Sequence, residues 1–160
     1  MPATAASALA RSSARTDLVE PIRDVSHAVI RHIVPHILAA GMEKSTFWPL
    51  HQLERAGEHH PSELAHRLGV SPAACTATID SLVALGYVVR RPSVEDRRQI
   101  VLRVTPKGRR AVETVWHRFA ASLEPFLAGL PPEDVAVTAR TLSTIAARLD
   151  AELAPGEAGA

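Results

Sequence analysis

Two short helical patterns lie close together between residues 60 and 86, in the sequence HPSELAHRLGVSPAACTATIDSLVALG. Gly69 separates them, and a glycine tolerates the positive φ angle that a tight turn between helices requires. Ser71 fits the N-cap of the second helix and Pro72 its first position, where a missing N–H loses no partner. Apolar residues recur at helical spacings in both segments: Leu64, Ala65, Leu68, Cys75, Ile79, Leu82 and Val83. We therefore predict a helix-turn-helix with Val70 filling its corner.

A hairpin is predicted immediately after the second of these helices. The runs YVVRR, from position 87, and QIVLRV, up to position 104, are short and rich in β-branched residues, as strands are. The residues between them, Pro92 to Asp96, favour a turn. A further helix should run from Ser45 to just before Gly57, with Pro49 tolerated near its first turn. Residues 45–104 are thus expected to form a winged helix-turn-helix.

The positive charge of the chain is concentrated around this hairpin. The whole protein carries a formal charge of only +1. The segment from Tyr87 to Arg110 contains eight arginines and lysines against Glu95 and Asp96, so its net charge is +6 and the rest of the chain carries −5. A cluster of this kind indicates an anionic partner, such as the phosphates of a nucleic acid.

Helical patterns also flank this core on both sides. Apolar residues at spacings of three and four predict a helix over residues 17–40, with Pro35 expected to kink or break its last turns. Residues 105–153 should contain two helices separated by the sequence GLPPEDV, the first of them capped by Thr105. A chain this small would leave much of these apolar faces in water, so we expect them to pair between two copies of the chain.

Composition is typical of one globular domain: 160 residues, 46% hydrophobic and 22% charged. The expected fold class is mainly α with a small β-hairpin, over residues 17–153, between a disordered N-terminal arm (1–16) and a disordered tail (154–160). Cys75 is the single cysteine, which excludes an internal disulfide and favours a reducing, cytoplasmic setting. The sequence contains no run of 18 or more apolar residues, so we expect no membrane-spanning segment. Neither a catalytic constellation nor a cofactor motif is found, so we expect no enzyme activity and no cofactor.

The sequence EDRRQIVLRVTPKG, residues 95–108, resembles the wing motif of the MarR family of bacterial transcriptional regulators. The motif has an acid, an arginine two residues later, an apolar strand, a threonine and a glycine, here Asp96, Arg98, Leu102, Val104, Thr105 and Gly108. Val104 replaces the more usual leucine. The resemblance covers residues 17–153 and implies a homodimer that binds double-stranded DNA, with residues 17–40 and 105–153 as its dimerisation helices.

The arginines of the hairpin are the main candidates for DNA contact. The minor groove has a strong negative potential, and a planar guanidinium fits it better than an ammonium group does. We expect Arg98 and Arg97 to enter it, and Arg90 and Arg91 to contribute further contacts. Asp96 is expected to pair with one of these arginines and fix its direction, a role that the resemblance also implies.

The second helix of the helix-turn-helix offers few groups for reading bases. Arg, Lys, Asn and Gln commonly contact base edges, but no lysine or arginine occurs between Gly69 and Arg90, which departs from the family pattern. The hydroxyl groups of Ser71 and Thr76 are expected to contact phosphates. The methyl groups of Ala73, Ala74 and Ala77 are expected to contact the methyl groups of thymine. Specificity would then depend on DNA shape read by the wing.

Two groups of residues are candidates for small-ligand sites. The resemblance suggests a pocket for a small aromatic or phenolic effector, lined by His27, Phe47, Trp48, His51 and Trp116, although core packing explains these residues equally well. Zinc is the second candidate ligand, since two histidines four residues apart share a helix face; they are His32 and His36. A surface or pocket-lining position is the simpler explanation for both.

Cys75 has two interpretations. Some members of the family sense oxidants through cysteine, but Cys75 lies on the inward stripe of its helix, where a small apolar side chain packs well. We therefore expect a core residue.

The sequence as a whole predicts a homodimeric repressor that binds a pseudo-palindromic operator and is released by a small molecule. The effector would change the distance between two recognition helices that must lie about 34 Å apart. Two alternatives stay open: a zinc-responsive regulator on the same scaffold, and a winged-helix protein-interaction module with weak DNA binding, which the uncharged helix favours. The sequence names neither operator nor effector, and does not separate repression from activation.

Overall fold

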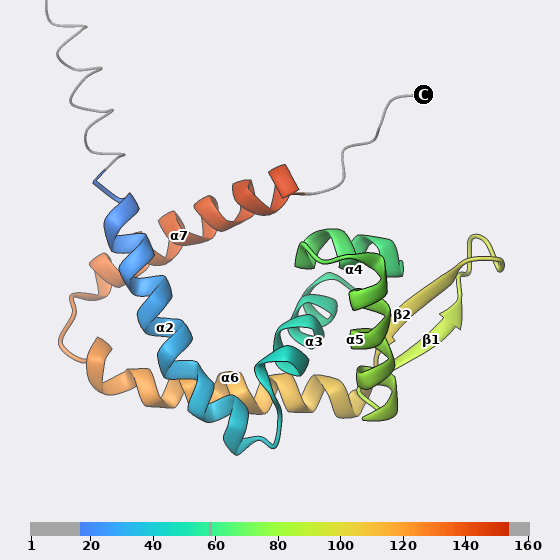
Figure 1. The fold of residues 1–160 in the computed structure, drawn as a ribbon. Coiled ribbons are helices and arrows are strands. Elements are labelled where there is room, and N and C mark those ends of the chain that lie inside the picture. Colours follow the sequence, from blue (N-terminus) through green and yellow to red (C-terminus); the bar gives the residue numbers. More distant parts are fainter. Residues whose placement is uncertain (1–16, 58, 154–160) are drawn as a thin grey trace, which may run out of the picture.

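The computed structural model of the protein describes residues 17–57 and 59–153 (Figure 1). Its elements are α2 (Val19–Ala39), α3 (Lys44–Ala56), α4 (Pro61–Leu68), α5 (Pro72–Ala84), β1 (Val88–Pro92), β2 (Ile100–Val104), α6 (Pro106–Leu127) and α7 (Pro132–Leu153). The predicted class, mainly helical with one antiparallel hairpin, is confirmed. The predicted arm and tail, 1–16 and 154–160, lie outside the described residues. In the described part, no helix is long and apolar enough to span a membrane.

The predicted helix-turn-helix is formed by α4 and α5. Gly69 ends α4 in the left-handed conformation, with φ at 62°, and the hydroxyl of Ser71 caps α5 by accepting a hydrogen bond from the backbone N–H of Ala74 at 3.3 Å. The inward faces of both helices are buried in the core: Leu64, Ala65, Cys75, Ile79 and Leu82. The prediction for Val70 is wrong, since its side chain is 40% exposed. Its backbone closes the turn instead, because the Val70 N–H donates to the carbonyl of Ala65.

The wing is formed by β1 and β2, which pair antiparallel with Arg90 opposite Leu102. Directly opposed residues of such a pair lie on the same face, and Leu102 is fully buried in the core. Arg90 therefore lies on the core-side face of the hairpin and its neighbour Arg91 on the other. A single bridge adds His59 to the sheet, since His59 and Leu102 exchange backbone hydrogen bonds at 2.8 and 3.3 Å. One paired residue is too short a strand to be visible in the sequence.

The start of α6 is bonded to the end of α5 through three hydrogen bonds, here termed the α5–α6 joint. The backbone N–H of Thr105 donates to the carbonyl of Tyr87 at 2.9 Å, and its hydroxyl donates to the carbonyl of Gly86 at 2.7 Å. The ammonium group of Lys107 donates to the carbonyl of Leu85 at 2.7 Å. These bonds satisfy the carbonyl of Leu85, which is the C-cap of α5 and has no partner within the helix, and those of the two residues after it.

Gly108 allows this close contact between the elements. It lies in the first turn of α6, where a Cβ atom would overlap the carbonyl oxygen of Tyr87. Thr105 also caps α6, as predicted, by accepting a hydrogen bond from the N–H of Gly108 at 3.1 Å. The threonine and glycine of the wing motif therefore have structural roles in the joint.

The helix α2 packs along α6, with Ile33 and Ile37 fully buried. Of the predicted kink or break at Pro35, the break does not occur, since α2 continues to Ala39. Pro35 lies on the exposed side, where a carbonyl that loses its helical partner can face solvent. The prediction for α3 also needs a correction, since it begins one residue earlier than expected and Pro49 falls in its second turn.

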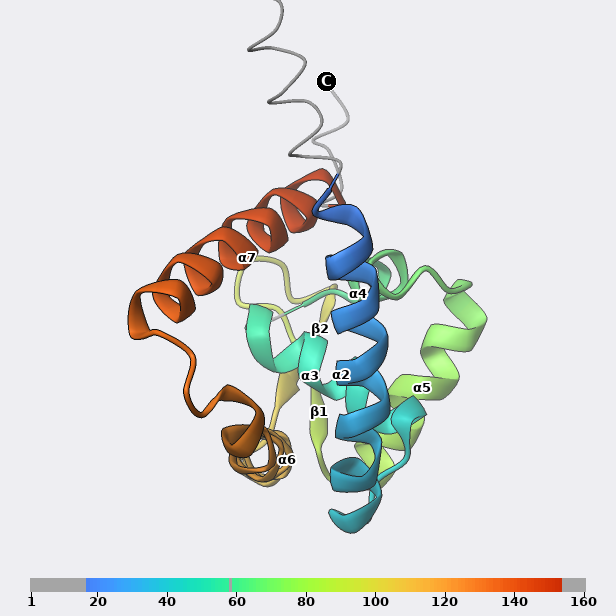
Figure 2. The same ribbon diagram turned by 90° about the vertical axis from the view of Figure 1, so that its left-hand side faces the viewer.

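The helix α7 stands apart from α3, α4, α5 and the wing, as the two ribbon views show (Figures 1 and 2). Nearly all of its described side chains are exposed, and Arg55 of α3 reaches it through an exposed ion pair with Asp150 at 3.6 Å. Large apolar side chains are exposed on α7, on α2 and at the end of α6. This terminal apolar surface contains Leu18, Val19, Val25, Ile30, Phe126, Leu127, Leu130, Val135, Val137, Leu142 and Leu149.

Cys75 is a core residue, as predicted, with 1% of its surface exposed. Burial raises the pKa of its thiol, so the reactive thiolate is disfavoured.

We expect Cys75→Ser to lower the free energy of unfolding by about 1–3 kcal/mol, because it places a hydroxyl group in the core. Urea denaturation measures this change, and Thr76→Ser on the exposed side of α5 is the control. The native thiol should also react with a disulfide reagent much more slowly than the unfolded one. Equal rates would contradict its buried position.

Candidate nucleic-acid interface

The exposed side chains in the first two turns of α5 are small and uncharged. The residues of its first two turns that were predicted to face DNA are all exposed: Ala73, Ala74, Thr76 and Ala77. The Thr76 hydroxyl donates to the carbonyl of Pro72 at 2.9 Å, and the Ser71 oxygen caps the helix. Both hydroxyls thus have partners within α5. The first two turns of this helix can therefore contact a partner mainly through methyl groups. The backbone N–H groups of its first turn can bind a phosphate.

Arg90 of β1 is bonded to the flank of this helix. Its guanidinium Nη2 lies 2.6 Å from Oδ1 of Asp80 on α5. The core-side position of Arg90 on β1 explains this reach. Of the four arginines predicted to contact DNA, Arg90 is therefore engaged by a carboxylate that the sequence analysis did not single out, because a pair between a helix and a strand has no fixed sequence spacing.

Other arginines surround a shallow pocket on the wing. Its lining residues come from both strands and from the turn: Arg91, Pro92, Ser93, Val94, Arg97, Val101 and Arg103. Arg91 and Arg97 thus line one shallow pocket. Their contact with DNA stays a prediction.

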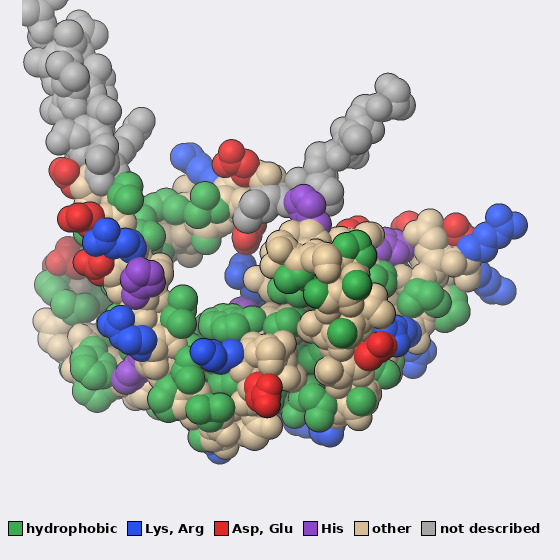
Figure 3. Space-filling model, in the orientation of Figure 1, with side chains coloured by type: hydrophobic (Ala, Val, Ile, Leu, Met, Phe, Trp, Pro, Cys, Tyr) green, Lys and Arg blue, Asp and Glu red, His purple; other side chains and the backbone are tan. Residues whose placement is uncertain are grey.

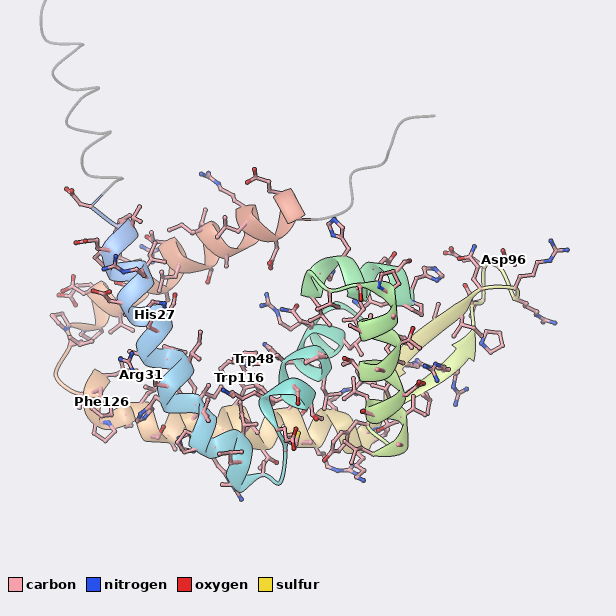
Figure 4. The ribbon with its side chains drawn as sticks, viewed as in Figure 1. His27, Arg31, Trp48, Asp96, Trp116 and Phe126 are labelled. Carbon is pink, nitrogen blue, oxygen red and sulfur yellow. The ribbon has the colours of Figure 1, made fainter. Side chains whose placement is uncertain are left out.

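Arg97 and Arg98 lie in the turn between β1 and β2, and Lys or Arg side chains are seen at the protruding tip of the wing (Figure 3). Both side chains are exposed. The expected ion pair from Asp96 to one of them is absent from the described residues. The Asp96 carboxylate instead accepts hydrogen bonds from the backbone N–H of Arg98 at 2.9 Å and from the side-chain amide of Gln99 at 3.3 Å. Asp96 (Figure 4) therefore shapes the turn that carries the arginines, as aspartate often does in turns.

The wing is fixed to α4 by two histidines and a glutamate that the sequence analysis missed. Glu63 accepts hydrogen bonds from the ring of His59 and from the backbone N–H of His60, each at 3.1 Å. Burial alone would raise the pKa of Glu63, but these bonds outweigh it and lower the pKa. His59 is itself paired with Leu102 of β2. The spacing of Glu63 from His60 fits a capping box, but histidine is an unusual residue for its first position.

The predicted effector residues are partly brought together. Trp116 of α6 donates to Nδ1 of His51 at 3.3 Å, and both rings lie near Phe47, with centroids 5.0–6.1 Å apart. Trp48 lies 5.1 Å from Phe47, which is fully buried and belongs to the core. His27 is different: it is exposed on α2, away from the two tryptophans (Figure 4).

His51 is the titratable group within this aromatic cluster. Burial, with a smaller contribution from the charge of Arg55, lowers its pKa. At neutral pH the ring is therefore uncharged, and its Nδ1 is free to accept the hydrogen bond from Trp116.

His32 and His36 do lie on one face of α2, with ring centroids 6.0 Å apart. Both rings contact Phe119, at 6.0 and 6.2 Å, and that of His32 also contacts Phe126 at 5.6 Å. These contacts are aromatic packing between α2 and α6. No group of three or more metal-ligating side chains is found in residues 17–57 and 59–153.

Comparisons with known proteins agree with this architecture. The sequence model of the MarR family matches residues 40–99, from the end of α2 to the wing. The HTH-type transcriptional repressor YetL of Bacillus subtilis is 34% identical over 87 residues, which cover 52% of this chain and 52% of YetL. The match thus spans about half the length of that relative.

Solved structures extend the likeness to nearly the whole fold. A MarR family protein from Bacillus stearothermophilus has a TM-score of 0.73 at 19% identity, over 87% of this chain and 97% of that one. CouR from Rhodococcus jostii RHA1, solved with p-coumaroyl-CoA bound, has a TM-score of 0.61 at 24% identity, over 81% and 92%. The family match agrees with the observed helix-turn-helix and wing. Over residues 40–99 the chain matches the MarR family of winged helix-turn-helix transcriptional regulators, and its fold is that of a solved MarR family protein.

Proposed function

We propose that the protein is a transcriptional repressor that binds a pseudo-palindromic operator as a homodimer and is released from it by a small aromatic effector. One observation carries this proposal: a wing with two exposed arginines at its tip is bonded to a helix-turn-helix. YetL, which is similar over 87 residues, is a repressor.

DNA binding follows from the positions of α5 and the wing. The small side chains of α5 allow the helix to approach base edges in the major groove. The wing tip then reaches the neighbouring minor groove, where Arg97 and Arg98 meet its negative potential. Neutralised phosphates provide affinity without sequence information, so recognition depends on the fixed distance between helix and wing.

Dimerisation is supported by the terminal apolar surface. A surface of this extent on α2, α6 and α7 is unusual for a soluble monomer and is typical of a subunit interface. A two-fold arrangement would place two copies of α5 in successive major grooves, about 34 Å apart. A dimer with two-fold symmetry binds best to DNA with the same symmetry, which is a palindromic operator.

Effector release would act through the cluster of Trp48, His51 and Trp116. These half-buried rings present apolar faces beside a neutral imidazole, which suits an aromatic ligand. Trp116 lies on α6, the helix that begins at the α5–α6 joint and ends in the terminal apolar surface. A ligand that moved Trp116 would therefore change the relation of the two DNA-binding units. CouR, with the same fold, binds a compound that has an aromatic ring.

Selection of bound fragments from random duplex DNA tests the proposed function. We expect enrichment of an inverted repeat whose half-site centres are about one helical turn apart. Failure to enrich any sequence above the starting library would contradict operator binding. An enriched asymmetric single site would contradict binding by a symmetric dimer.

Two substitutions of Asp96 separate turn geometry from charge. Asp96→Ala removes the acceptor for the Arg98 N–H, so we expect operator affinity to fall by about 0.5–1.5 kcal/mol, although a negative charge beside DNA is lost. Asp96→Asn keeps an acceptor oxygen without the charge and should bind as the wild type does, or more tightly. Arg98→Ala is the reference, with an expected loss of about 1–3 kcal/mol per site. Tighter operator binding by Asp96→Ala at fixed salt would show that the turn geometry is unimportant.

The dimer is tested by analytical ultracentrifugation. The wild-type chain should sediment as a dimer at micromolar concentration rather than as a 17.2 kDa monomer. Leu142→Glu places a charge in the terminal apolar surface and should shift the equilibrium toward monomer. Thr114→Glu adds the same charge on the exposed side of α6 and should leave the dimer intact. A wild-type protein that stays monomeric would rule out the proposed assembly.

The effector site has an internal reporter, because Trp48 and Trp116 are the two tryptophans of the chain. We expect p-coumaric acid or a related aromatic acid to change the tryptophan fluorescence over the same concentrations that release the operator. Trp116→Phe should weaken both effects. An effector that released DNA without changing the fluorescence would place its site elsewhere.

A further inference from the structure

The pair of Asp80 and Arg90 joins the two elements that must contact DNA together. Asp80 lies on α5 and Arg90 on β1, and their side chains are 59% and 38% exposed. The Nη2 to Oδ1 distance of 2.6 Å is that of a short charge-assisted hydrogen bond. An exposed pair of this kind adds little to folding stability. Its main effect is therefore expected on the charge of the DNA-binding surface.

Asp80 is the single ionisable side chain of α5 other than the buried thiol of Cys75. A carboxylate on a helix that enters a DNA groove repels phosphates unless a cation neutralises it. Arg90 supplies this cation. The same pairing reduces the ability of Arg90 to bind a phosphate, because its guanidinium is already engaged by a carboxylate.

Arg91, Arg97 and Arg98, the other three arginines predicted to bind DNA, form no ion pair with a carboxylate among the described residues. Arg91 and Arg97 surround the pocket on the wing, and Arg98 contacts Asp96 through its backbone N–H. Of the four arginines predicted to bind DNA, Arg90 is the one that a carboxylate holds against the recognition helix. Asp80 thereby limits the number of wing arginines that are available to phosphates.

We infer that Asp80 is a specificity-determining residue: by binding Arg90, it lowers the affinity for DNA of any sequence and fixes the wing relative to α5. This inference rests on the proposed operator binding. Affinity for non-operator DNA comes almost entirely from phosphate neutralisation. Operator binding also requires helix and wing to occupy adjacent grooves in one fixed relation. Release of Arg90 would therefore strengthen non-operator binding and remove one constraint that favours the operator.

The test measures the affinity of the full chain for two duplexes, the operator recovered by selection and a scrambled duplex of the same composition, over a series of potassium chloride concentrations. For Asp80→Asn we expect the slope of log K against log salt on the scrambled duplex to become steeper by about 0.9 for each additional phosphate that the protein neutralises. The ratio of operator to scrambled affinity should fall. Asp80→Ser should reproduce both changes, and thermal unfolding verifies that each variant is folded.

Two controls separate release of Arg90 from a simple change in charge. Glu95→Gln removes one negative charge from the wing turn without releasing Arg90, and should change the slope less than Asp80→Asn does. In an Arg90→Gln background, Asp80→Asn should leave the slope unchanged, because no arginine remains to be released.

Three results would overturn the inference. One is a slope for Asp80→Asn no steeper than that for Glu95→Gln. Another is an unchanged ratio of affinities. A third is loss of preference at one base pair with an unchanged slope, which would mean that Asp80 accepts a hydrogen bond from a cytosine amino group. Failure of the proposed function looks different: the wild-type protein itself would not distinguish the two duplexes.

Discussion

The bonds between the end of α5 and the start of α6 are the constraint on which the rest of the structure depends. Thr105 and Lys107 satisfy carbonyls at the end of the recognition helix, and Gly108 allows α6 to lie against the carbonyl of Tyr87. Because β1 begins directly after this turn and β2 ends directly before Thr105, the same bonds fix the base of the wing. Recognition helix, wing and α6 are therefore connected at one point.

This connection also provides a route for the effector response that we propose. The helix α6 carries Trp116 in its middle and part of the terminal apolar surface at its end. A displacement of α6 at either place would be transmitted to the joint if the helix moved as a unit. Coupling of this kind needs no change within α5 itself.

Local sequence signals predicted the fold well. Ser71 and Thr105 cap helices as expected, and Gly69 takes the left-handed conformation, because capping depends on residues within a few positions of one another. Predictions that depended on side-chain direction were less successful. Val70 is 40% exposed and Asp96 bonds to a backbone N–H. The pair of Arg90 with Asp80 was not foreseen. Which partner a long side chain reaches depends on how separate elements pack, and sequence spacing does not encode this.

The central claim is that α5 and the wing contact adjacent grooves of one operator as a rigid unit, once per subunit. Hydroxyl-radical footprinting of the selected operator, combined with methylation protection at guanine N7, measures both grooves on the same DNA. We expect two symmetric half-sites, each with a protected major-groove segment and a protected minor-groove segment beside it. Protection of the major groove without the neighbouring minor groove would contradict this claim.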